Sequence, residues 1–176
     1  MMAKDFYSAI EDRRSIYAIS KEQVVSDEKI QEVIYHAVKH TPSAFNSQSA
    51  RVVVLLGEQH DKLWDITSGY GTVLYFEDSE VVEGLQANFA LYKDNFPTWS
   101  QQSSGMLQFA IWTALEIEGF GATLQHYNPL IDEEVRKEWD VPENWKLTAQ
   151  MPFGKPVVHA GEKEFQPLEN RVKIYK

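Results

Sequence analysis

Apolar side chains recur with a helical period in the first third of this chain. Residues 30–38 place them at i, i+3, i+4, i+7 and i+8, and Ser26 or Asp27 precedes the run as an N-cap. Pro42 breaks the pattern. The spacing therefore predicts an amphipathic helix that ends near His40.

Further helical patterns follow, and they are predicted over residues 61–68, 79–92, about 99–118 and 129–139. Within the third of these, residues 105–117 are apolar nearly all round. A helix of that kind has no face suited to water, so we expect it to be buried against its own core, a partner subunit or both.

Shorter runs predict strands. The segment RVVVLLG at 51–57 is β-branched and apolar throughout, which predicts a strand covered on both faces, and residues 73–77 predict a second strand. Residues 145–151 alternate apolar and polar positions, which is typical of a half-buried strand. Helices and strands that do not strictly alternate favour an α+β domain around a mostly antiparallel or mixed sheet.

Length and composition narrow the class of protein. The chain has 176 residues, of which 43% are hydrophobic, and this suits one domain over residues 1–176. With 26 acidic against 17 basic residues, it is not expected to bind nucleic acid or an anionic membrane. The absence of cysteine excludes thiol chemistry, and no apolar stretch reaches the length of a membrane span or resembles a signal peptide. We expect a soluble, cytoplasmic protein.

Arg13 stands out in this acidic chain. On a helical wheel it falls in the apolar stripe of Phe6, Ala9 and Ile10, while Arg14 lies nearer the flank. The arginine either lays its aliphatic stem on apolar surface with its head in water, or meets an anion that offsets its lost hydration.

The C-terminal segment RVKIYK offers a second pair of cations. Its period of two places Arg171 and Lys173 on one face with Cβ atoms about 7 Å apart. These two side chains could grip one phosphate.

Several other motifs do not support a site. GFGATL at 119–124 has a leucine where a dinucleotide fingerprint needs its third glycine, and a helix precedes it. His36 and His40 have a metal-binding spacing but no nearby third ligand, and there is no GxSxG elbow. We therefore predict no metal site and no catalytic side chain.

Amide-rich loops remain, at 45–49, 124–128 and 152–155. Amides offer donors and acceptors together, which suits the edge of a heterocycle, although ordinary turn chemistry also favours these residues.

Five ordered motifs together resemble one family, the FMN-dependent nitroreductases. They are RRS at 13–15, PSAFNSQ at 42–48, GFGATLQHYNPL at 119–130, MPFGKP at 151–156 and the tail RVKIYK. The resemblance covers nearly the whole chain and is greatest to the short branch that includes the copper-induced nitroreductase of lactic acid bacteria and fungal nitroreductase-like proteins. It implies a nitroreductase-like α+β fold, built as an intertwined homodimer with two FMN sites lined by both chains.

Carried over by position, the resemblance also implies the residues that bind FMN. Those expected at the phosphate, the ribityl chain and the ring are Arg13, Arg14, Ser15, Asn46, Gln48, Gln125, His126, Gly154, Lys155, Arg171 and Lys173. Asn46 and Gln48 would reach the flavin from the partner chain. Many relatives carry a further Arg or Lys where this chain has Tyr17, so the resemblance assigns Tyr17 no role.

The implied activity is transfer of a hydride from NADH or NADPH through flavin N5 to a nitroaromatic or quinone acceptor. Two other classes of function stay open: a flavin-binding regulatory or stress-response protein whose turnover is incidental, and a flavin-free dimeric interaction module.

Overall fold

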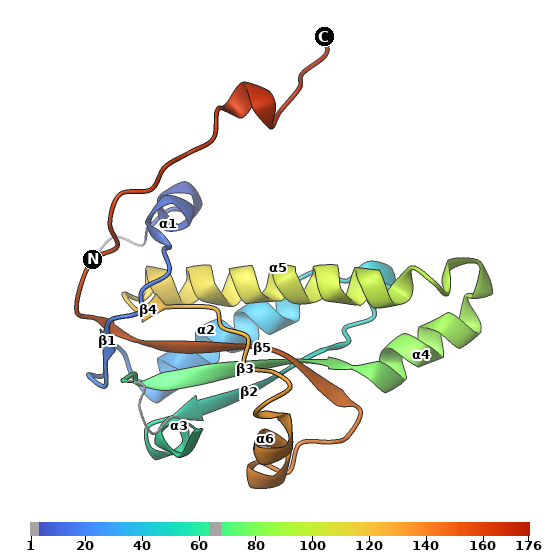
Figure 1. Cartoon of the computed structure of the whole chain (residues 1–176), viewed down its shortest axis with the longest axis horizontal. Helices are drawn as coiled ribbons and strands as arrows, with labels where there is room; N and C mark the ends of the chain where they lie inside the picture. Colours follow the sequence, from blue (N-terminus) through green and yellow to red (C-terminus); the bar gives the residue numbers. More distant parts are fainter. Residues whose placement is uncertain (1–3, 64–67) are drawn as a thin grey trace.

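An antiparallel sheet forms the middle layer of the computed structural model, which describes residues 4–63 and 68–176 (Figure 1). The strands lie in the order β1-β5-β3-β2, and β4 pairs with β5 beside β1. Their bounds are β1 Ile19–Ser20, β2 Ala50–Leu56, β3 Gly71–Asp78, β4 Gly121–Ala122 and β5 Trp145–Pro156. The predicted α+β class with a mostly antiparallel sheet is confirmed.

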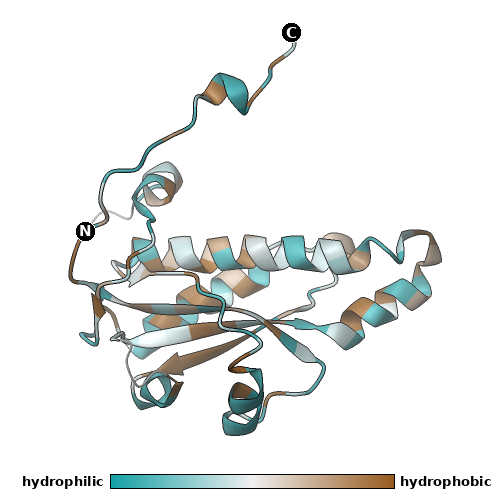
Figure 2. Cartoon of the chain, viewed as in Figure 1, coloured by the Kyte–Doolittle hydropathy of each residue, from teal (hydrophilic) through white to brown (hydrophobic). Residues whose placement is uncertain are grey.

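Position in the sheet decides how deeply each strand is buried. All of β3 is buried, because it lies between β5 and β2. By contrast β2 is an edge strand whose side chains are mostly half-buried, so the expected cover on both faces is incomplete, although its residues are strongly hydrophobic (Figure 2).

The longest strand, β5, corrects two expectations. It runs 12 residues to Pro156, so the segment 152–155 is strand and not the expected polar loop. Residues 149–154 are all buried, where the alternating pattern predicted a half-buried strand. One face of β5 packs into the core beneath α2 and α5 through Ala149, Met151 and Phe153, and β3 on one edge and β1 and β4 on the other make it an interior strand.

Helices cover both faces of the sheet (Figure 1). The helices α2 (Asp27–His40) and α5 (Phe96–Ile117) pack on one face, and α3 (Glu58–Leu63) and α6 (Asp132–Glu138) lie on the other. Beneath α2 and α5 a core forms from their apolar faces and from the sheet, including Ile30, Ile34, Val73, Ile111, Leu115 and Met151. A smaller core on the other side contains Leu55, Leu74, Phe76, Val135 and Leu147. This burial is the main stabilising term of the fold.

Helix ends follow the capping residues. Ser26 caps α2 through a hydrogen bond to the backbone N–H of Lys29, as the sequence predicted. Asp78 caps α4 (Ser79–Asn88), but this helix ends before the predicted Tyr92, and residues Ala90–Tyr92 form a 3₁₀ turn, η2. After α5, Gly119 adopts a φ of +90°, which stops the helix where predicted.

Two other predicted helices differ at their boundaries. Helix α6 begins at Asp132 and not at Pro129, because residues 127–131 form turns first. Helix α3 begins at Glu58, earlier than expected, and residues 64–67 of the predicted 61–68 helix lie outside the described residues.

The last twenty residues leave the sheet after Pro156 and run away from the body of the molecule (Figure 1). They contain one 3₁₀ turn, η3 (Leu168–Asn170), and they form no strand, so the period of two at 171–176 does not correspond to a strand within the described chain. Seven of their apolar side chains are largely exposed, namely Val157, Val158, Phe165, Leu168, Val172, Ile174 and Tyr175.

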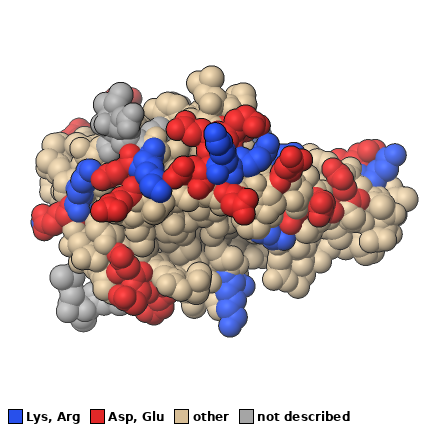
Figure 3. Space-filling model, turned by 90° about the horizontal axis from the view of Figure 1, so that it is seen from below, with Lys and Arg blue, Asp and Glu red and all other residues tan. Residues whose placement is uncertain are grey.

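Charge and hydropathy add two observations on the whole molecule. Acidic side chains lie among the lysines and arginines on the face drawn in Figure 3, so this face carries mixed charge. Among the described residues, no helix combines the length and the hydropathy that a membrane crossing requires.

Candidate functional site

Arg13 lies immediately after α1 (Phe6–Asp12), where the backbone turns to an extended conformation with φ −62° and ψ 110°. Its guanidinium carbon stacks 4.3 Å from the centroid of the Trp112 ring on α5. Its Nε is buried and has no hydrogen-bond partner within the described chain. Burial, and secondarily the charge of Arg14, lowers the pKa of Arg13. The side chain is therefore a half-buried cation with an unused donor, which are the properties expected of an arginine that binds an anion.

Arg14 and Ser15 continue from Arg13 along the sheet. Ser15 forms a parallel bridge with Ala122, and the N–H of Ile16 donates to the carbonyl of Ala122 at 3.0 Å. This pairing fixes the segment beside β4. Tyr17, which follows it, is largely exposed.

A pocket of about 440 Å³ opens beside Arg14, and Lys4, Trp112 and Glu116 help to line it. Lys4 forms ion pairs with Asp12, at 2.8 Å, and with Glu116. The indole Nε1 of Trp112 and one oxygen of Glu116 are buried, and neither meets a hydrogen-bond partner in the residues that the structure covers. Unused polar atoms therefore cluster at this end of α5.

The loop that carries Asn46 and Gln48 has an unusual backbone. Phe45, Asn46 and Gln48 have φ values of 56°, 52° and 48°, in the left-handed region that non-glycine residues rarely occupy. Both amide side chains lie on exposed residues, and the N–H of Gln48 donates to Ser43 Oγ at 2.9 Å. The ring of Phe45 stacks on Trp99, with centroids 6.1 Å apart.

Gln125 and His126 lie beside β5. Gln125 exchanges two backbone hydrogen bonds with Gln150, at 2.7 and 2.9 Å, and it is half-buried, while His126 is exposed. The side-chain oxygen of Gln150 accepts the N–H of Tyr127 at 2.7 Å, and its amide nitrogen is buried with no partner among the described residues.

Gly154 and Lys155 have local structural explanations. A Cβ atom at Gly154 would lie 2.4 Å from the carbonyl oxygen of Ser20, so only glycine allows β1 to approach this closely. Lys155 is exposed and forms an ion pair with Glu22 at 2.5 Å.

The predicted site residues fall into separate regions of the chain. Pairing of β4 with β5 brings Arg13, Arg14 and Ser15 to the same end of the sheet as Gly154 and Lys155. The loop of Asn46 and Gln48 lies against α5, whereas Arg171 and Lys173 are exposed on the tail, away from the sheet (Figure 1).

Sequence reasoning missed Trp112 and Gln150. Trp112 lay within an apolar helix, so periodicity assigned it to packing, whereas Gln150 lay on the polar face of an alternating strand, which predicted exposure. A partial signal for Trp112 was that Glu116 lies four residues later, on the same side of an α-helix. His36 and His40 are exposed, and within the described ranges no three His, Asp or Glu residues form a group that could hold a metal ion.

Comparison with known proteins shows which protein family the chain resembles in sequence and in fold. Residues 10–155 match the model of the nitroreductase family. Structures of nitroreductase CinD from Lactococcus lactis, in complex with nicotinic acid, 4-nitrophenol and chloramphenicol, are 44 to 45% identical, with TM-scores of 0.93 to 0.94. Each comparison covers 98% of this chain and 100% of that chain.

Two further proteins extend the comparison. The nitroreductase homologue HBN1 of Saccharomyces cerevisiae is 37% identical over 93% of this chain and 93% of its own length. A structure from Exiguobacterium sibiricum in complex with FMN shares the fold, with a TM-score of 0.75 and 14% identity over 99% of each chain.

This protein is thus an α+β oxidoreductase of the nitroreductase type in both sequence and fold. The chain belongs to the nitroreductase family, as its five motifs predicted.

Proposed function

We propose that the protein binds FMN and transfers a hydride from NADH or NADPH to a nitroaromatic or quinone acceptor. The observation that carries this proposal is Arg13, a half-buried cation stacked on Trp112 with an unused Nε donor. The 4-nitrophenol and nicotinic acid complexes of the 45 and 44% identical CinD support the same substrate class.

The residues present fit FMN. Its phosphate is an anion that would satisfy the Nε of Arg13, and its ring carries alternating carbonyl and N–H groups that suit amide side chains. The buried and unpartnered Nε1 of Trp112 provides a second free donor at the same end of α5 within the described structure. The chemistry that bound FMN supplies is acceptance of a hydride and its delivery to a second substrate.

The chain's own residues bind and orient the cofactor in this proposal. Arg13, with Arg171 and Lys173, holds the phosphate, while Arg14 and Ser15 hold the ribityl chain or the pyrimidine edge. Asn46 and Gln48 contact the ring or the ribityl chain from the partner subunit. Gln125 and His126, with the weaker candidates Gly154 and Lys155, lie along the flavin.

Two exposed apolar surfaces support a homodimer. On one side of α5, Met106, Phe109 and Ile117 are each 39 to 44% exposed. The C-terminal tail also exposes apolar side chains. A second chain would cover both surfaces and would complete a site whose residues are dispersed in one chain.

The test is the absorption spectrum of the purified protein, followed by steady-state NAD(P)H oxidation. We expect a yellow protein with a flavin spectrum that turns over with a nitroarene and with a quinone. A yellow protein without turnover on any acceptor would support the regulatory or stress-response alternative. A colourless protein that does not bind added FMN would contradict the cofactor and the enzyme together.

A further inference from the structure

The loop of residues 43–49 cannot hold its shape by local preference. Three of its residues, Phe45, Asn46 and Gln48, occupy the left-handed region without being glycine. Such backbone persists only where the surrounding structure holds it in place. Contacts with residues around the loop must therefore stabilise this conformation.

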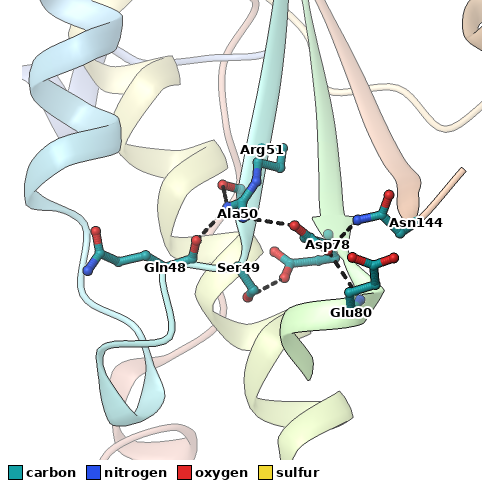
Figure 4. A network of polar contacts seen from close by, with 8 residues as sticks. Gln48, Ser49, Ala50, Arg51, Asp78, Glu80 and Asn144 are labelled. Atoms are coloured by element: carbon teal, nitrogen blue, oxygen red, sulfur yellow. Dashed lines mark hydrogen bonds and ion pairs between the residues drawn. The ribbon is translucent and has the colours of Figure 1, made fainter. Parts of the chain in front are cut away.

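Arg51 and Asp78 hold the end of the loop where it enters β2 (Figure 4). Arg51 donates to the carbonyl oxygen of Gln48 at 2.5 Å and pairs with Asp78 at 2.8 Å. The backbone N–H of Asp78 donates to the carbonyl oxygen of Ser49 at 3.0 Å. Asn144 donates to Asp78 at 2.7 Å and so orients that carboxylate.

Ser49 and Glu77 form a second, buried contact. The hydroxyl of Ser49 donates to Glu77 Oε2 at 2.6 Å, and the two residues are only 1% and 4% exposed. The other carboxylate oxygen of Glu77 is buried and has no hydrogen-bond partner in the described chain. A buried carboxylate with an unused oxygen destabilises a fold more than an apolar pair would, so stability does not account for it.

These contacts act on the backbone of the loop and on the hydroxyl of Ser49, not on the amide side chains of the loop. Figure 4 shows the side chain of Gln48 extending away from Arg51 and Asp78. Asn46 and Gln48 are both exposed, and the amide nitrogen of Gln48 donates to the carbonyl oxygen of Asn46 at 3.5 Å, a long distance for a hydrogen bond. Both amides are therefore accessible to a ligand.

We propose that Ser49 and Glu77, with Arg51 and Asp78, are positioning residues that hold the strained 43–49 loop so that Asn46 and Gln48 meet the flavin. The inference rests on the proposed function. It adds four residues that do not touch the cofactor but that set the geometry of two that do.

The experiment compares Ser49→Ala with Ser100→Ala. Like Ser49, Ser100 is a buried serine whose hydroxyl donates one hydrogen bond, here to the carbonyl oxygen of Pro97 at 3.1 Å. Ser100 lies on α5, outside the loop. FMN affinity is measured by flavin fluorescence, and exchange of the amide hydrogens of residues 43–49 is measured on FMN-free protein. Loss of one buried hydrogen bond predicts about tenfold weaker FMN binding and faster exchange in Ser49→Ala, with neither change in Ser100→Ala.

Glu77→Gln provides the rescue. Its amide oxygen still accepts from Ser49, so we expect FMN affinity within about twofold of the wild type and slow exchange in the loop. We also expect shifted absorption maxima of bound FMN in Ser49→Ala and unshifted maxima in Glu77→Gln and Ser100→Ala. A merely structural role would lower the melting temperature without moving this spectrum.

Unchanged FMN affinity or unchanged loop exchange in Ser49→Ala would overturn the positioning role. Failure of the wild-type protein to bind FMN is a different result, because it would overturn the proposed function itself. The exchange measurement then still decides whether Ser49 and Glu77 hold the loop.

Discussion

The guanidinium of Arg13 loses part of its contact with water in the folded chain, and stacking on the ring of Trp112 compensates for only part of that loss. Stacking at 4.3 Å stabilises the guanidinium, yet its Nε stays without a partner within the described residues. An anion at this position would remove that deficit, which is why the residue carries the proposed function.

We expect Arg13→Ala to weaken FMN binding about 10- to 100-fold, because a charge-assisted hydrogen bond to the phosphate is lost. Flavin fluorescence titration measures the effect. Arg136→Ala is the control, since Arg136 lies on α6 and pairs with Glu133 at 3.0 Å. Equal affinities in the two variants would contradict the assignment of Arg13.

Glu77 predicts a pH dependence of stability. Burial raises its pKa above the ordinary 4.5, although the hydrogen bond from Ser49 and the charge of Arg51 counteract this and the nearby Asp78 adds to it. The folded state therefore binds the proton more tightly than the unfolded state. The contribution of protonated Glu77 to the stability of the fold is therefore fully present below pH 4.5, and it is lost as the pH rises through the raised pKa.

Glu77→Gln should therefore gain stability relative to the wild type between pH 4.5 and 7. Urea denaturation of both proteins at several pH values measures the difference, and contributions from other titrating groups cancel. Glu80→Gln, at an exposed position on α4, is the control variant that removes one carboxylate outside the core. A difference between Glu77→Gln and the wild type that stays constant with pH would argue against the raised pKa.

At the scale of elements, α5 has two apolar sides with different roles. Leu107, Ile111 and Leu115 are buried against the sheet, whereas Met106 and Phe109 are 44% and 39% exposed. The sequence predicted burial against the core, a partner or both. The structure shows the first, and the exposed side supports the second.

Phe109→Glu should leave the fold intact and break the proposed homodimer, because the new charge would be buried in the interface without a partner. Light scattering gives the molar mass, and circular dichroism checks the fold. Lys137→Glu on α6, at the other face of the sheet, should remain dimeric. A Phe109→Glu protein that stays dimeric would place the interface elsewhere.

At the scale of the whole molecule, the tail is the part that a single chain leaves least explained. Val172, Ile174 and Tyr175 are 56 to 86% exposed, and the neighbouring Arg171 and Lys173 are exposed as well. Apolar side chains in that number favour contact with another surface. A partner subunit would provide one and would bring the two cations to a phosphate.

The double variant Arg171→Ala with Lys173→Ala should bind FMN about tenfold more weakly, and added salt should reduce the difference from the wild type. The matched control is Lys163→Ala with Lys176→Ala, which removes two charges from the same tail. If both double variants bind FMN alike, the phosphate contact of the tail is wrong.

Local patterns by themselves determined the class and most elements of this protein. The spacing of apolar residues located α2 together with its Ser26 cap, and it located β3, because helical and extended periods depend on residues close in sequence. The ordered motifs likewise sufficed for the family, since each is a short run of residues.

Only the tertiary structure decided which distant residues meet. The stacking of Arg13 on Trp112, the hydrogen bond between Ser49 and Glu77 and the burial of β5 on both faces depend on packing between separate elements. Periodicity reports which side of an element is apolar, but it does not report what covers that side. For this reason the sequence could show that Arg13 is unusual. Only the fold shows that its guanidinium stacks on Trp112 and that its Nε is buried without a partner in the described chain.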